Sequence, residues 1–193
     1  MLVMVFDCLG KCSIYSIPMN FPSNTETLLS HKTGKEYALV LADQVTFGPN
    51  AAKQIASICS QAEVYKIFEA LFKGRPYAEK DAEFFINHVQ AGWKNRTNFH
   101  WMVFDDEEIV GTVGIKSVDG EIGYWQSNRH PGVMSFAVKK LCDFAKAAGM
   151  PSLWAYVRRD NIASIRVLER AGFELDEALT AKREDALGYR KLL

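Results

Sequence analysis

The chain has no surplus of charge of either sign, because its 193 residues carry 23 Lys and Arg against 23 Asp and Glu. Without a net field, the composition gives no support for a protein that binds nucleic acid or an anionic membrane. Long apolar runs are missing as well, since the opening Met-Leu-Val-Met-Val-Phe is too short to span a bilayer and lacks the basic segment of a signal peptide. We therefore expect a cytoplasmic protein.

Cysteine is scarce and scattered, at Cys8, Cys12, Cys59 and Cys142. The close pair Cys8 and Cys12 has no second pair of Cys or His nearby, so the spacing predicts no zinc site, and no metal is implied. Four thiols in a chain of this length do not indicate a disulfide scaffold either. The overall composition, with 48% hydrophobic and 24% charged residues, is typical of one globular domain.

The first half of the chain alternates apolar segments with polar breaks. We expect strands over residues 1–6, 13–18 and 37–41, with a polar loop over 20–35. Apolar residues at helical spacing predict helices over residues 50–60, 62–71 and 80–93.

The second half turns to strand-forming sequence. Three strands joined by short turns are expected over residues 100–104, 109–115 and 122–126. Helical spacing then predicts a helix from Val133 that ends before Gly149. After it we expect, in order, a strand at 153–157, a helix at 161–171, and strands at 173–175 and 186–191.

The most informative stretch is Asp-Asn-Ile-Ala-Ser-Ile-Arg-Val-Leu-Glu-Arg-Ala-Gly-Phe at 160–173. Asp160 or Asn161 can cap a helix by accepting from backbone N–H groups in its first turn. Gly172 can end that helix in the left-handed conformation, so the stretch is fully explained as a capped helix.

The same residues also carry a resemblance to a known family. The stretch resembles a signature of the GNAT acetyltransferase superfamily, N-x-x-S-x-x-V-x-E-x-x-G-F. The matching residues are Asn161, Ser164, Val167, Glu169, Gly172 and Phe173. Upstream, Gly-Glu-Ile-Gly-Tyr-Trp-Gln at 120–126 resembles the family's fourth strand, and 129–134 stands where the family has R/Q-x-x-G-x-G/A. The resemblance is to the ribosomal-protein N-acetyltransferase-like branch and covers roughly residues 35 to 192.

This resemblance implies a fold in the α/β class, of the α+β kind. A mixed, mostly antiparallel sheet of six to seven strands would be flanked by helices, with the fourth and fifth strands splayed apart. The pantetheine arm of acetyl-CoA would lie in that gap and pair with the fourth strand. We expect the domain to occupy 35–193, after an N-terminal extension at 1–34 that matches no pattern.

The loop before the helix at Val133 is the expected cofactor site, because a helix entered through Gly presents free N–H groups to a diphosphate. The resemblance implies contacts to acetyl-CoA from Trp125, Gln126, Arg129, Gly132, Val133, Met134, Ser135 and Asn161, with His130 adding charge. A plain turn before a helix remains the alternative. Met134 also replaces the family's usual Gly or Ala, and Pro131 has no N–H group.

Acetyl transfer to an amine needs a base, a donor to the developing oxyanion and an acid for the thiolate. Many superfamily members place a Tyr acid where this chain has Leu168, so we expect Ser164 to take that role. Glu121 is the expected base, directly or through a water, and Tyr124 could line the cleft. The alternatives are a first-turn helix serine and a solvated turn glutamate.

The acceptor side is the least determined. Aromatic and basic candidates for it, which could equally belong to the core, are Tyr65, Phe68, Phe72, Arg75, Tyr77 and Trp93. Acidic residues at 106–108 could attract a cationic acceptor or form a solvated turn.

We therefore expect an acetyl-CoA-dependent N-acetyltransferase that forms a ternary complex with a primary amine, either a protein N-terminus or a small molecule. It could form a homodimer. The alternative is a weak or inactive GNAT-fold module that binds CoA or another protein. Leu168 and Met134 favour this alternative, whereas Asn161, Ser164 and Gly132 oppose it.

Overall fold

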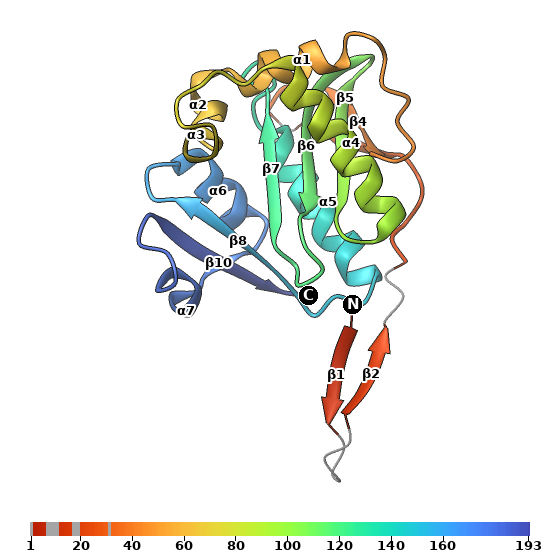
Figure 1. Cartoon of the computed structure of the whole chain (residues 1–193), viewed down its shortest axis with the longest axis vertical. Coiled ribbons are helices and arrows are strands. Elements are labelled where there is room, and N and C mark those ends of the chain that lie inside the picture. Colours follow the sequence, from red (N-terminus) through yellow and green to blue (C-terminus); the bar gives the residue numbers. More distant parts are fainter. Residues whose placement is uncertain (1, 7–11, 17–19, 31) are drawn as a thin grey trace.

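A computed structural model of the chain describes residues 2–6, 12–16, 20–30 and 32–193 (Figure 1). Its centre is a five-stranded antiparallel sheet in the order β3-β4-β5-β6-β7. The strands are β3 (Glu26–Leu29), β4 (Glu36–Leu41), β5 (Phe99–Asp105), β6 (Glu108–Ile115) and β7 (Ile122–Gln126). The predicted three-strand meander is thus confirmed as β5 to β7.

A second, three-stranded sheet has the order β8-β10-β9. Its strands are β8 (Ser152–Arg158), β9 (Glu174–Leu175) and β10 (Ala186–Leu192). The two sheets meet at one end only, where Glu121 and Trp154 form a parallel bridge and the Trp154 N–H donates to the Gly120 carbonyl at 2.9 Å. From there β7 and β8 diverge (Figure 1), which confirms the predicted splay between these strands.

Helices cover both faces of the five-stranded sheet. The helices α1 (Ala51–Cys59) and α4 (Glu79–Asn95) pack on one face, and α5 (Val133–Ala147) packs on the other (Figure 1). Helix α6 (Ile162–Arg170) lies against α5. Short helical turns complete the set at α2 (Ala62–Tyr65), α3 (Glu69–Phe72) and α7 (Glu177–Thr180). None of the helices within the described ranges is long and apolar enough to cross a bilayer.

The alternation of side chains along β5 explains this sandwich. Phe99 and Trp101 join the core on the α5 face, where Trp101 stacks on Phe144 with ring centroids 5.2 Å apart. Met102 points to the opposite face and packs in the core under α1 and α4. Because successive side chains of a strand alternate, a strand that is apolar on both faces must be covered on both.

Two expectations need correction. The stretch at 20–35 contains strand β3 and is not only a loop, because Leu28 is buried in the core and β3 pairs with β4. The five-stranded sheet therefore continues across residue 34. The segment at 62–71 forms two separate turns, α2 and α3, in place of one helix.

At the N-terminus, β1 (Leu2–Phe6) and β2 (Cys12–Ser16) form a separate antiparallel pair. The end of the strand expected at 13–18 lies outside the described residues, as does Cys8. Cys59 and Cys142 are buried free thiols.

Candidate functional site

The edge of β7 that faces β8 is open. The Ser127 N–H donates to the Val110 carbonyl at 2.7 Å, and the Glu121 carbonyl accepts from the Lys116 N–H at 2.6 Å, just after β6. Because backbone groups alternate in direction along an antiparallel strand, the N–H and C=O groups of Tyr124 and Gln126 face the gap. An extended ligand could pair with this edge as another strand would.

A cavity of about 220 Å³ occupies the gap between β7, β8 and α6. Its walls include the predicted residues Glu121, Tyr124, Asn161 and Ser164, together with Leu168. The structure therefore brings the three expected catalytic side chains into one cavity, although they come from two segments about forty residues apart.

Tyr124 reaches across the gap to helix α6. Its hydroxyl donates to the backbone carbonyl of Ser164 at 3.1 Å. Burial raises the pKa of the Tyr124 phenol above its ordinary value, although the contact with Ser164 opposes the shift. Tyr124 is therefore a protonated phenol at neutral pH and is held by the helix that carries Ser164.

Of the two residues expected to cap helix α6, Asp160 and Asn161, the structure has Asn161 as the cap. Its side-chain oxygen accepts from the Ser164 N–H at 3.1 Å. One turn later, Leu168 is 1% exposed and anchors the helix in the core. The cap and the anchor together fix the position of Ser164 at the edge of the cavity.

The cavity is lined by ion pairs. Glu121 accepts from Lys116, and both residues line the cavity. On the β8 side, the Arg183 guanidinium binds the Asp185 carboxylate at 2.8 Å and lies 5.2 Å from the Tyr156 ring. The cavity thus offers carboxylates and cations to a polar acceptor.

The N-terminus of helix α5 begins at Gly132, which has φ +91°. Gln126 accepts from the Met134 N–H at 3.1 Å, so one amide of the expected diphosphate cradle already has a partner. The side chains of Val133 and Met134 are buried in the core, and only their backbone can face a ligand. Among the described residues, no group bonds the buried Ser135 hydroxyl.

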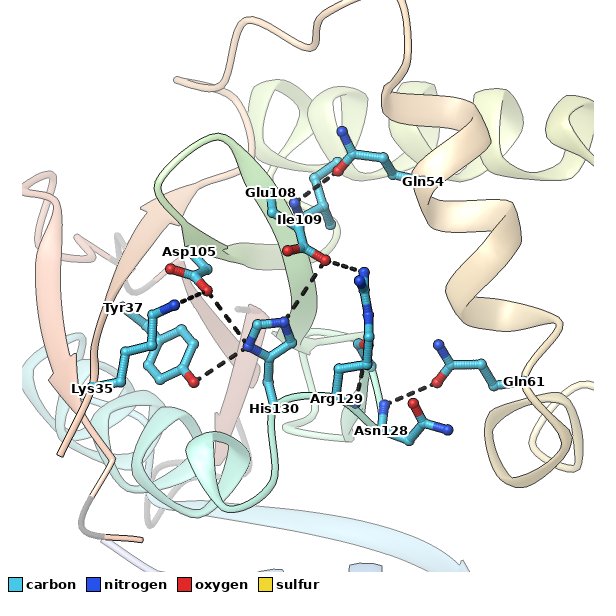
Figure 2. Close-up of polar contacts among 11 residues, drawn as sticks. Lys35, Tyr37, Gln54, Gln61, Asp105, Glu108, Ile109, Asn128, Arg129 and His130 are labelled. Atoms are coloured by element: carbon cyan, nitrogen blue, oxygen red, sulfur yellow. Dashed lines mark hydrogen bonds and ion pairs between the residues drawn. The ribbon is translucent and has the colours of Figure 1, made fainter. Parts of the chain in front are cut away.

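Arg129 is bound to an acidic turn, as Figure 2 shows. Its guanidinium donates to Glu108, and the neighbouring Asn128 N–H donates to the Gln61 side chain at 2.9 Å. His130 is buried beside Tyr37, whose hydroxyl lies 3.3 Å from Nδ1. Glu108 therefore holds the loop, whereas its neighbours Asp106 and Glu107 are exposed.

His130 lies between two carboxylates, with Nδ1 3.7 Å from Asp105 and Nε2 3.8 Å from Glu108. Donor atoms of these three residues all lie within 4.8 Å of one another, and such atoms can bind divalent cations. However, Asp105 is already paired with Lys35 and Glu108 with Arg129, and the two ring nitrogens face different carboxylates. The arrangement serves better as a polar clamp on the loop than as a metal site.

Several expected contacts lie elsewhere. The Trp125 indole packs on Phe85, with ring centroids 5.7 Å apart, in the core under α1 and α4. It therefore points away from the cavity. The expected acceptor residues Phe68 and Phe72 pack on Tyr77, and Trp93 packs on Phe99. From the same part of the chain, the side chain that does line the cavity is Ile67.

The comparisons with known proteins agree on one family. The family model described as Acetyltransferase (GNAT) domain matches residues 45–174. No curated protein sequence matches the chain at a significant level.

Solved structures share the fold at low sequence identity. The GNAT domain of S. lividans PAT has a TM-score of 0.67 and 16% identity, covering 90% of this chain and 100% of that one. The microcin C7 self-immunity acetyltransferase, solved with acetyl-CoA and AMP, has a TM-score of 0.63 and 19% identity, covering 92% and 100%. The ribosomal-protein-S5-alanine acetyltransferase from Vibrio fischeri has a TM-score of 0.56 and 20% identity, covering 81% and 92%.

Proposed function

The chain belongs to the GNAT acetyltransferase family, and on that premise we propose that it transfers an acetyl group from acetyl-CoA to a primary amine by direct attack in a ternary complex. One observation carries the proposal. The open edge of β7 and the side chains of Glu121, Tyr124 and Ser164 meet in the same cavity. The acceptor would be a protein N-terminus or a small-molecule amine.

The residues present fit acetyl-CoA, which supplies the acetyl thioester when bound. The free N–H and C=O groups of Gln126 and the free C=O group of Tyr124 would hold the amides of the pantetheine arm. The diphosphate would lie at the N-terminus of α5, where Gly132 leaves room and Ser135 has an unbonded hydroxyl. Asn161 contributes indirectly, by holding Ser164 in place.

Different side chains of the cavity would carry out the two proton transfers, one from the amine and one to the thiolate. The Glu121 carboxylate accepts a proton from the substrate ammonium, directly or through a water, which leaves a nucleophilic amine. The backbone N–H group of Tyr124 would stabilise the negative charge that develops on the thioester oxygen. Tyr124, as a buried and protonated phenol, or the adjacent Ser164 hydroxyl donates a proton to the departing thiolate.

The test is amine-dependent release of the CoA thiol, measured with acetyl-CoA and a panel of N-terminal peptides and small amines. Release with one class of amine, together with a mass increase of that amine by one acetyl group, supports the proposal. If no amine releases the thiol faster than water does, the proposed transfer is wrong.

A GNAT-fold binding module is the second candidate, and two observations favour it. Leu168 stands where many family members have a catalytic Tyr, and Gln126 occupies the Met134 N–H at the expected cradle. This candidate predicts binding of CoA or a protein partner without turnover of any amine.

A further inference from the structure

A lysine from outside the family motif lies at the expected diphosphate site. Lys32 belongs to the turn between β3 and β4, which closes through bonds from the Ser30 N–H to the Lys35 carbonyl at 2.8 Å and from the Gly34 N–H to the Ser30 carbonyl at 2.7 Å. The strands on either side are paired, and Leu28 is buried in the core. The turn that carries Lys32 is therefore anchored at both ends.

The Lys32 side chain crosses the N-terminus of α5. A Cβ placed on Gly132 would lie 2.9 Å from Cδ and 3.2 Å from Cγ of Lys32. Any other residue here would push the Lys32 side chain aside, and the φ of +91° is one that residues other than glycine rarely adopt. The absent side chain of Gly132 thus makes room for the Lys32 stem as well as for a ligand.

The charge of Lys32 has no counter-charge among the described residues. Within the described parts of the chain no carboxylate pairs with it, whereas Arg129 is bound by Glu108 and Lys35 by Asp105. The 15-residue helix α5 has no acidic residue in its first turn, and its N-terminus is itself positive. Two positive groups without a counter-charge favour an anion at this place.

A second observation in the same turn of helix points to a ligand. Ser135 is 6% exposed, and its hydroxyl has no hydrogen-bond partner among the described residues. Burying a hydroxyl without a partner costs free energy, which a bound acceptor oxygen would recover.

We propose that Lys32 binds the diphosphate of acetyl-CoA and supplies the main side-chain positive charge there, in place of Arg129. This inference rests on the proposed function. Lys32 precedes residue 45, where the match to the family model begins, so a search by motif would not find it. The β3–β4 turn would then be part of the cofactor site.

The experiment is calorimetric titration of the full chain with acetyl-CoA and with S-acetylpantetheine, which lacks the diphosphate. We expect Lys32→Gln to weaken acetyl-CoA binding about tenfold, the order of one charge-assisted hydrogen bond, and to leave the S-acetylpantetheine affinity unchanged. Lys32→Arg keeps the charge and should stay within about threefold of the original chain.

Two further variants make the comparison specific. Lys139→Gln removes the same charge from an exposed position on α5 and should change affinity by less than about twofold. Arg129→Gln should weaken binding less than Lys32→Gln does, because its guanidinium is bound by Glu108 and acts on the loop. An unchanged affinity in Lys32→Gln, or a larger loss in Arg129→Gln, would overturn this inference alone. Absence of acetyl-CoA binding in the original chain would overturn the proposed function with it.

Discussion

At the scale of single residues, Tyr124 is the side chain on which the proposed mechanism depends most. It is the buried phenol of the cavity, and its hydroxyl contacts the helix that carries Ser164. The motif comparison placed the acid on Ser164 because Leu168 occupies the usual Tyr position. The structure brings another phenol to the same cavity from strand β7.

We expect Tyr124→Phe to lower kcat about a hundredfold, because a positioned general acid contributes that order of rate. The Kd for acetyl-CoA should stay the same, since the backbone of residue 124 still lines the gap. Ser164→Ala should cost less, about tenfold, if the serine assists the phenol. Steady-state kinetics and calorimetry on both variants separate the two effects.

The larger loss identifies the acid, so a greater effect in Ser164→Ala would return that role to the serine. Full activity in both variants would remove them from the mechanism.

His100 provides a residue-scale prediction about stability. Burial lowers its pKa to about 3, and the positive charges of His88 and Lys116 act in the same direction. The unfolded chain takes up a proton near pH 6.5, whereas the folded chain does not, so the stabilisation is present above that pH and is lost as pH falls toward 3. This group can lower the free energy of unfolding by about 1.4 kcal/mol per pH unit.

Urea unfolding at pH 7 and pH 5 measures this slope. His100→Gln should show a smaller loss between the two pH values, whatever its stability at pH 7. Equal slopes in the two proteins would mean that His100 takes up its proton in the folded state.

At the scale of elements, long periodic segments could be predicted and short ones could not. Apolar spacing was enough to predict α4, α5 and the β5 to β7 meander. Strand β3 has only four residues within a polar stretch, and it becomes a strand because it pairs with β4 and buries Leu28. Both its pairing with β4 and its burial under α5 depend on other parts of the chain. A segment of four residues is too short to show them as a periodic pattern.

Some residues of the candidate site could likewise be predicted from local sequence, and others could not. The motif predicted Asn161, Ser164 and Gly132, because capping and helix entry are local properties. It could not predict that Trp125 packs into the core or that Lys32 crosses Gly132, since both depend on contacts with distant segments. The clamp on His130 was missed because its acidic turn is distant in the sequence.

Strand β3 also gives the element-scale prediction. A chain that begins at residue 20 keeps Phe21, whose ring lies 4.6 Å from that of Phe99, and keeps Leu28. We expect it to unfold at the same urea concentration as the full chain. A chain that begins at residue 35 loses both side chains and the β3 pairing, so it should lose at least about 3 kcal/mol of stability.

Equal stability of the two shortened chains would show that β3 contributes nothing to the fold. It would then place the domain boundary at residue 34, as the sequence suggested.

At the scale of the whole molecule, the two sheets join at one end and separate at the other. This leaves one edge of β7 unpaired beside a cavity that is lined by Glu121, Tyr124 and Ser164. Native sheets usually cover such an edge, so an open one inside the molecule needs a partner. The pantetheine arm of acetyl-CoA is the partner that the family and the cavity favour.

Calorimetric titration of the purified chain with acetyl-CoA, beside free CoA, tests this account most directly. The account predicts one site with a Kd in the micromolar range, and loss of binding in Gly132→Val, where a side chain would meet Lys32 and strain a φ of +91°. An absence of binding at millimolar acetyl-CoA would contradict the account and leave a GNAT fold that acts through a protein partner.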